Sequence, residues 1–306
     1  MGAAHIYLDQ PDPLSELLTR LELQAEVYVS GEFCGTWAVD TAGSRRMPFH
    51  FIGDGEAWLH FENDPPRHLQ RRDLVVFPHD AHHVISNSRR RPGRARINQP
   101  MSNDGAVTHM VCGFFEFRSP AIFPVLDSLP PLVFLPSAAG SASGRLLDLI
   151  LQELAAARPG HYAAIDQLAL LVFVEILRQR FSSGELSGGL LAALFDARLG
   201  RALNALHRCP EQPWTLALLA EQAAMSRSSF SERFSKVVGM APIRYLTLWR
   251  MSEARRLLQR SEFSTAQVAE RCGYETEAAL RKAFRNTLGE TPGAVRARLR
   301  GETTDG

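Results

Sequence analysis

The chain has 306 residues, which is long enough for about two domains. Hydrophobic residues make up 45% and charged residues 22%, an ordinary composition for a globular protein. Its net charge of +1 hides an asymmetry: residues 214–300 carry 15 Lys and Arg against 8 Asp and Glu, a net +7, and the remainder carries −6. No apolar run approaches the roughly 20 residues that cross a bilayer, residues 1–13 lack a signal-peptide pattern, and the four cysteines form no CxxC pair, so we expect a cytoplasmic chain with reduced thiols and no membrane partner.

The first domain is expected over residues 14–135 and is mostly strands. Short β-rich stretches, separated by turn residues, lie at 26–29, 57–61, 74–77 and 108–117. Strands at this close spacing predict a sandwich or small barrel. The polar, basic stretch from Arg89 to Gln99 is expected to be a loop. Its arginines could bind an anionic effector or could simply be solvated.

Residues 141–182 have helical spacing and form a linker between the two domains. Leu146, Leu147, Ile150, Leu151 and Leu154 exceed one narrow apolar stripe, and a second helix runs to Arg180. This segment either pairs two subunits or packs onto its own barrel, and the sequence favours neither. Residues 182–189 combine Ser and Gly and are the expected boundary.

The second domain, residues 196–300, contains a helical unit that occurs twice. Ala220 matches Ala269 at an offset of 49, while Phe234 matches Phe284 at an offset of 50. Each unit is expected to be a helix, a tight turn and a second helix. Gly273 suits the left-handed turn, whereas its counterpart in the first unit is Ala224, a poorer choice. Ser264 and Gln267 have the spacing of a capping box.

The second helix of each unit leaves one polar face free. Such a face fits the major groove of DNA, with early residues near bases and Arg or Lys on phosphates. The residues expected to bind DNA are Arg227, Ser228, Ser231, Glu232 and Lys236 in the first unit, and Thr276, Glu277, Arg281, Lys282 and Arg285 in the second. Residues 243–260 join the units as one helix of about 27 Å, which could hold both faces about one DNA turn apart.

These features resemble the C-terminal domain of the AraC/XylS family of bacterial transcription regulators. The resemblance rests on Gly273-Tyr274, Ala283-Phe284-Arg285, Gly289 and Thr291-Pro292. The chain departs from the family pattern at Ala224, where a glycine is usual, and at Leu280, where a phenylalanine is usual. The resemblance implies double-stranded DNA and RNA polymerase as partners. It implies base contacts from Ser228, Ser231, Glu232, Glu277, Arg281 and Lys282.

The N-terminal domain resembles a cupin, the sensor half of one branch of that family. The resemblance rests on residues 50–59, 72–78 and 82–84. It implies a small barrel whose mouth holds a small-molecule effector, with His50, Glu56, Trp58 and His83 as the binding residues. His50 lacks the second histidine two residues away that cupin metal sites use, so no metal, no cofactor and no catalytic residue are expected.

The expected fold class is therefore mixed α and β, with an N-terminal cupin-like β-barrel, a helical linker and a C-terminal all-α double helix-turn-helix. The expected function is that of a sequence-specific transcriptional regulator and not an enzyme, with a homodimer possible. Two alternatives stay open: a metal-dependent cupin enzyme with a fused helical domain, and a DNA-binding protein whose barrel only dimerises.

Overall fold

The computed structural model describes residues 13–21, 23–99, 105–117, 123–136, 140–184, 188–259 and 262–302. Contacts divide the chain into two compact units. One, the barrel unit, contains residues 23–117 and 129–185; the other, the helical unit, contains residues 1–22, 118–128 and 186–306. Residues 1–12, on which the signal-peptide expectation rests, and residues 185–187 of the expected boundary lie outside the described residues.

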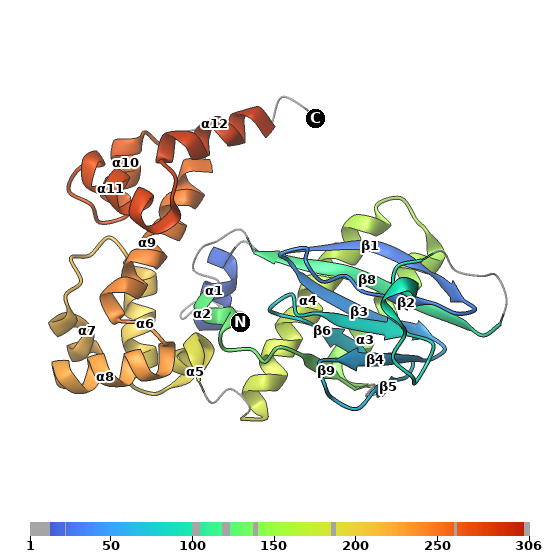
Figure 1. Cartoon of the computed structure of the whole chain (residues 1–306). Helices are drawn as coiled ribbons and strands as arrows, with labels where there is room; N and C mark the ends of the chain where they lie inside the picture. Colours follow the sequence, from blue (N-terminus) through green and yellow to red (C-terminus); the bar gives the residue numbers. More distant parts are fainter. Residues whose placement is uncertain are drawn as a thin grey trace, which may run out of the picture. The chain divides into compact units, whose positions relative to one another are not determined.

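The barrel unit consists of two antiparallel sheets (Figure 1). The five-stranded sheet has the order β1-β8-β3-β6-β9. Its strands are β1 (Leu23–Cys34), β8 (Val107–Phe117), β3 (Met47–Asp54), β6 (Leu74–Val76) and β9 (Val133–Leu135). The four-stranded sheet has the order β2-β7-β4-β5. Its strands are β2 (Ala38–Val39), β7 (His83–Ser86), β4 (Ala57–Phe61) and β5 (Arg67–Leu69).

Apolar side chains fill the space between the two sheets. Along β4, Ala57, Leu59 and Phe61 belong to this core, as the period-two spacing of a strand requires. The core also contains Phe33, Trp37, Ile52, Leu69, Val75, Phe77, Ile85, Met110 and Cys112. Gly113 in β8 lets the Phe49 ring lie across that strand, because a Cβ there would come within 2.3 Å of the ring.

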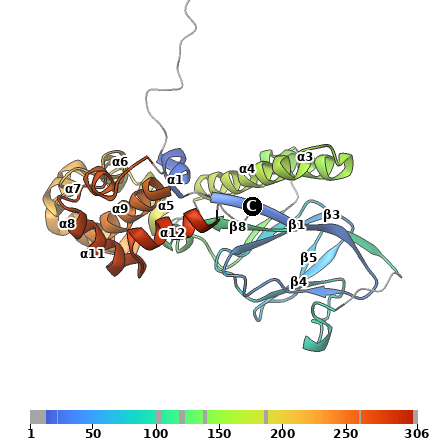
Figure 2. The same cartoon turned by 90° about the horizontal axis from the view of Figure 1, so that it is seen from above.

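Two helices, α3 (Ala142–Ala156) and α4 (His161–Ser182), cover the outer face of the five-stranded sheet (Figure 2). Ser141 caps α3 by accepting a hydrogen bond from the Gly144 amide. On α4, the Phe173 ring packs 5.0 Å from that of Phe115, and the Asp166 carboxylate accepts a bond from the Val27 amide. The linker segment thus packs onto its own sheet, which is one of the two arrangements expected from the sequence.

The helical unit contains α5 (Gly189–Phe195), α6 (Leu199–Arg208), α7 (Leu216–Gln222), α8 (Arg227–Val238), α9 (Pro242–Gln259), α10 (Thr265–Arg271), α11 (Glu277–Leu288) and α12 (Pro292–Glu302). It also includes α1 (Pro13–Leu21), which contacts α5, α6 and α9, and α2 (Phe123–Leu126), which contacts α5. The expected barrel domain, residues 14–135, had included α1 and α2. None of the helices in the described part of the chain is both long and apolar enough to span a membrane.

The mixed α and β class with a helical C-terminal half is confirmed. The long helix α9 lies at the centre of the helical unit, in contact with α8 on one side and α10, α11 and α12 on the other (Figure 1). Its Tyr245 and Trp249 are fully buried. The Trp249 ring stacks on that of His207 at 3.7 Å, which fixes α9 against α6.

Candidate functional site

The first helix-turn-helix is α7 and α8, and side-chain caps begin both helices. Thr215 Oγ1 accepts a bond from the Leu218 amide, and Ser226 Oγ accepts one from the Ser229 amide, both at 3.2 Å. Phe230 and Phe234, four residues apart on α8, are buried. The opposite face of α8 is therefore left to solvent.

The second helix-turn-helix, α10 and α11, repeats this arrangement. Ser264 and Gln267 form the predicted capping box on α10, and Thr276 Oγ1 caps α11 by accepting a bond from the Ala279 amide at 3.1 Å. Leu280 and Phe284 are fully buried.

The same hydrogen bond closes the turn in both units. The Met225 amide donates to Ala220 O at 2.9 Å in the first unit, and the Tyr274 amide donates to Ala269 O at 2.9 Å in the second. These pairs are 49 residues apart, the offset found in the sequence. Ala224 takes the left-handed conformation, with φ 50°, where the second unit has Gly273 with φ 73°. The residue at this position is therefore left-handed in both turns, as predicted for Gly273.

The structure places the predicted DNA-binding residues on the free faces of α8 and α11. Arg227, Ser228, Glu232, Lys236, Thr276, Arg281, Lys282 and Arg285 are exposed, while Ser231 and Glu277 are half-buried. Glu277 forms an ion pair with Arg281 one turn later. The first-turn amides that Ser226 and Thr276 do not cap have no partner within the helix, and the positive end of the helix dipole there favours an anion.

Sequence reasoning missed the role of Arg233. This exposed arginine on α8 donates to Asp196 Oδ2 at 2.5 Å, and the other oxygen of that carboxylate accepts from the Arg198 and Leu199 amides at the start of α6. These bonds and the Arg233 charge lower the pKa of Asp196, against an opposing effect of burial. Arg233 therefore links α8 to the start of α6. Because its guanidinium is already paired with Asp196, it is less available to contact DNA than the other exposed side chains of α8.

Inside the barrel, His50 and His83 form one hydrogen-bonded chain with a thiol. His83 Nδ1 donates to Ala81 O at 2.8 Å, so its Nε2 is an acceptor, which lies 2.9 Å from His50 Nε2 and 3.1 Å from the Thr41 hydroxyl. His50 Nδ1 then accepts from Cys112 Sγ at 3.1 Å. Burial raises the pKa of the Cys112 thiol, which keeps the proton that this bond needs.

The hydrogen-bonded side chains of His50, His83 and Cys112 do not suit a metal ion. Both nitrogens of each imidazole already have partners, and no group of three or more His, Cys, Asp and Glu in the described residues has a metal-binding arrangement. Desolvation by burial lowers the pKa of His50 and of His83, and the neighbouring His83 lowers that of His50 further. Both rings are therefore neutral near pH 7.

The other two predicted effector residues lie elsewhere. Glu56 pairs with His68 at 2.8 Å, and its side chain is 70% exposed. The Trp58 ring stacks on that of His68 at 4.7 Å, on the side of β4 opposite the core residues. The structure thus brings His50 and His83 together but not Glu56 or Trp58 with them. His60, on β4, is buried and bonded to Ser86 Oγ.

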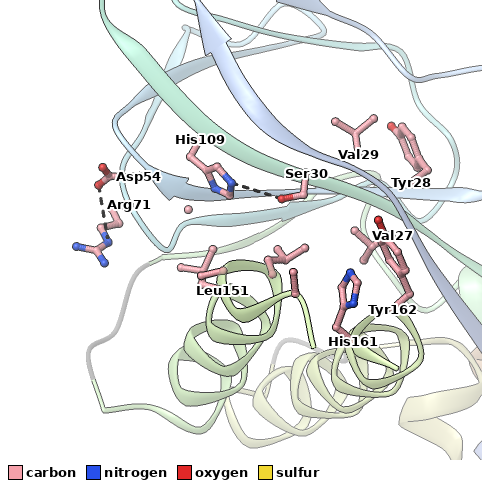
Figure 3. Close-up of a pocket in the computed structure, with 14 residues that line it drawn as sticks. Val27, Tyr28, Val29, Ser30, Asp54, Arg71, His109, Leu151, His161 and Tyr162 are labelled. Carbon is pink, nitrogen blue, oxygen red and sulfur yellow. Dashed lines mark hydrogen bonds and ion pairs between the residues drawn. The ribbon is translucent and has the colours of Figure 1, made fainter. Parts of the chain in front are cut away.

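A pocket of about 870 Å³ lies between the outer face of the five-stranded sheet and the α3–α4 hairpin. Figure 3 shows His109 and Ser30 on the strands facing Leu151, His161 and Tyr162 on the helices. His109 Nε2 is 3.4 Å from Ser30 Oγ, and His161 Nδ1 donates to Arg158 O at 2.7 Å, which leaves His161 Nε2 free to accept. No motif in the sequence pointed to these residues, because they come from four separate segments.

Comparisons with known proteins match both halves. A cupin family model matches residues 12–182, and a helix-turn-helix domain model matches residues 219–298. An AraC-like transcription regulator of Streptomyces lividans is 32% identical over 93% of this chain and 98% of its own length. One of Streptomyces antibioticus is 31% identical over 93% and 98%. The DNA-binding domain of AdpA, solved with a target DNA, is 39% identical over 36% of this chain and 98% of its own, with a TM-score of 0.33.

The similarity to these two relatives extends over both halves of this chain, the cupin region and the helix-turn-helix region. The chain belongs to the AraC family of DNA-binding transcriptional regulators, with an N-terminal cupin domain.

Proposed function

We propose that the chain reads DNA by placing α8 and α11 in two successive segments of the major groove. The observation that carries this proposal is the repeated geometry: each unit has a capped second helix, the same turn hydrogen bond and a polar free face, and α9 joins the two. Early residues of each helix would meet base edges. Lys236 and Arg285, in the last turns, would meet phosphates.

The two helices would contribute unequally. The first presents small hydroxyls, Ser228 and Ser231, which hydrogen-bond to several bases and discriminate weakly. The second presents Arg281 and Lys282, and an arginine fork suits the O6 and N7 acceptors of guanine. In the free protein Glu277 pairs with Arg281, so Arg281 would exchange this partner for a base on binding.

A selection from random duplexes with the full chain tests this proposal. The wild type should enrich a two-part site. The double variant Arg281→Ala/Lys282→Ala should lose one part and at least about 10-fold in affinity, since one good base pairing is worth about 1–3 kcal/mol. The double variant Arg158→Ala/Arg178→Ala, which changes exposed arginines of the barrel unit, is the matched control and should behave as the wild type. An unchanged site in the first variant would refute the role of α11.

The barrel unit would then be the sensor, and the chain a cytoplasmic regulator without catalytic activity. The pocket in Figure 3 is better suited to a small effector than the buried His50–His83 pair, because it is open to solvent and has polar and apolar walls. An effector held between sheet and hairpin would change how α3 and α4 pack. A thermal-shift screen should find ligands whose effect is lost in Leu151→Trp, which fills the pocket, and kept in the exposed control Gln152→Trp.

Partners beyond DNA follow from the family and from exposed surface. Leu149, Leu171 and Phe181 on the α3–α4 hairpin are between 44% and 51% exposed, which supports a homodimer through this hairpin. RNA polymerase is proposed on family grounds alone, and a two-hybrid or transcription assay with the purified enzyme would test it.

A further inference from the structure

The geometry points to a second ligand site on the barrel unit, built for a phosphate group on a small molecule. It lies at the arginine loop, residues 87–99, which follows β7 and contains the short 3-10 helix η1 (Arg94–Arg96). The loop belongs to neither helix-turn-helix unit, and its pocket shares no lining residue with the pocket under the α3–α4 hairpin.

Two asparagines hold the loop at both ends against residues 35–40. The Asn87 side chain accepts from the Trp37 amide at 3.3 Å and donates to Gly35 O, while its own amide donates to Trp37 O. The Asn98 side chain accepts from the Asp40 amide at 3.0 Å and donates to Asp40 O at 2.8 Å. The loop is therefore fixed at its two ends, and the arginines between them are presented by an ordered backbone.

The charge of this loop is unusual for its surroundings. Half of the ten Lys and Arg residues between 23 and 117 are the arginines at 89, 90, 91, 94 and 96. All five are exposed. The ion pairs of the described residues involve other basic side chains. Within the described residues, no carboxylate therefore forms an ion pair with any of these five arginines. Such a cluster raises the local concentration of anions and would gain stability from binding one.

Three of the arginines line a pocket of about 540 Å³. These are Arg90, Arg91 and Arg96, together with Asn87, Ser88 and Pro92. Arg91 Nη1 already donates to Glu62 O at 2.7 Å, which orients that guanidinium and leaves its other N–H groups free. The pocket is larger than a bare phosphate, and Pro92 and Ala38 offer an apolar wall for an organic remainder.

Phosphate fits these groups better than a single carboxylate. A phosphate monoester carries close to two negative charges at pH 7 and three acceptor oxygens, enough to engage more than one guanidinium fork at once. The shared chemistry is the phosphoryl group, whether it comes from a phosphorylated metabolite or from inorganic phosphate. The site makes no use of the DNA-binding face, so it can be tested without DNA.

Isothermal titration of the full chain with ribose 5-phosphate, inorganic phosphate and malate tests the site. We expect arginine-dependent binding of the phosphate ester, at least about 10-fold weaker in Arg90→Gln/Arg96→Gln. Arg94→Gln is the matched control, because Arg94 is in the loop but does not line the pocket, and it should bind as the wild type. If the double variant unfolds, Arg90→Lys/Arg96→Lys keeps the positive charges but loses the bidentate guanidinium donors. It should still bind the phosphate ester more weakly than the wild type.

The arms distinguish the source of the phosphate. Tighter binding of ribose 5-phosphate assigns the site to a phosphorylated metabolite, and equal binding assigns it to inorganic phosphate; both support a phosphate site. Equal or tighter binding of malate overturns it. An equal loss in Arg94→Gln would mean unspecific attraction and also overturns it, as would a wild type that binds neither ribose 5-phosphate nor inorganic phosphate.

Discussion

Gly273→Ala should destabilise the second helix-turn-helix much more than its small size suggests. Gly273 has φ 73°, a conformation that costs an alanine about 1 kcal/mol. The added Cβ would also lie 2.5 Å from Glu211 O and 2.6 Å from Arg250 Nη2. The Arg250 guanidinium donates to Pro210 O and Gln212 O, both at 2.7 Å, so it cannot move away without losing a bond.

The expected cost is about 2–4 kcal/mol, from the strained backbone and one lost bond of a charged donor. Two further variants separate these causes. Gly289→Ala has a similar φ of 72° with nothing within 4 Å, so it should cost only about 1 kcal/mol. Ala224→Gly relieves the same strain in the first unit and should stabilise it by about 0.5–1 kcal/mol.

Hydrogen exchange of the full chain, followed by mass spectrometry, measures the free energy of opening in each helix. Exchange in α10 and α11 should accelerate strongly in Gly273→Ala, and exchange in α7 and α8 should slow in Ala224→Gly. If Gly273→Ala cost no more than Gly289→Ala, the close approach of Arg250 to this turn would be refuted.

Three further predictions concern the barrel, the DNA contacts and the hairpin. Burial lowers the pKa of His50 and His83 in the folded state, so the stability they contribute is full above the unfolded pKa of about 6.5 and is lost as the pH falls below it. The free energy of unfolding should fall by up to about 1.4 kcal/mol per pH unit for each histidine. Urea unfolding between pH 7.5 and 5 should show this dependence, and His50→Gln should reduce it. Arg285→Ala should reduce the slope of log affinity against log salt by about 0.9, and an unchanged slope would exclude its phosphate contact. Sedimentation at micromolar concentration should give a dimer that Leu171→Asp dissociates and the exposed control Gln167→Asp does not.

The helical half was predictable because its signals are local. Capping residues, the 49-residue offset of the turn and buried positions four apart on a helix each follow from spacing along the chain. The free faces of α8 and α11 then follow by elimination, since the buried faces are occupied by Phe230, Phe234, Leu280 and Phe284. Arg233 was not distinguishable from its neighbours, because its partner Asp196 lies 37 residues away.

The barrel half was predictable as strands but not as a site. The neighbours of an inward-facing strand residue depend on how the two sheets face each other, which brings His50 of β3 to His83 of β7 across 33 residues and leaves Glu56 and Trp58 outside this pair. Likewise, α1 joins the helical unit through contacts with α5, α6 and α9 that no periodicity in its nine residues reveals. The arginine loop was visible as a run of charge, but Asn87 and Asn98, which order it, were not.

Methylation interference on a selected operator tests the central claim most directly, because it marks the guanines contacted in the major groove. Two clusters of interfering guanines about 10 base pairs apart on one face are predicted for one chain, with the cluster at α11 lost in Arg281→Ala/Lys282→Ala. A single cluster that this variant leaves intact would contradict the reading of two successive grooves by α8 and α11.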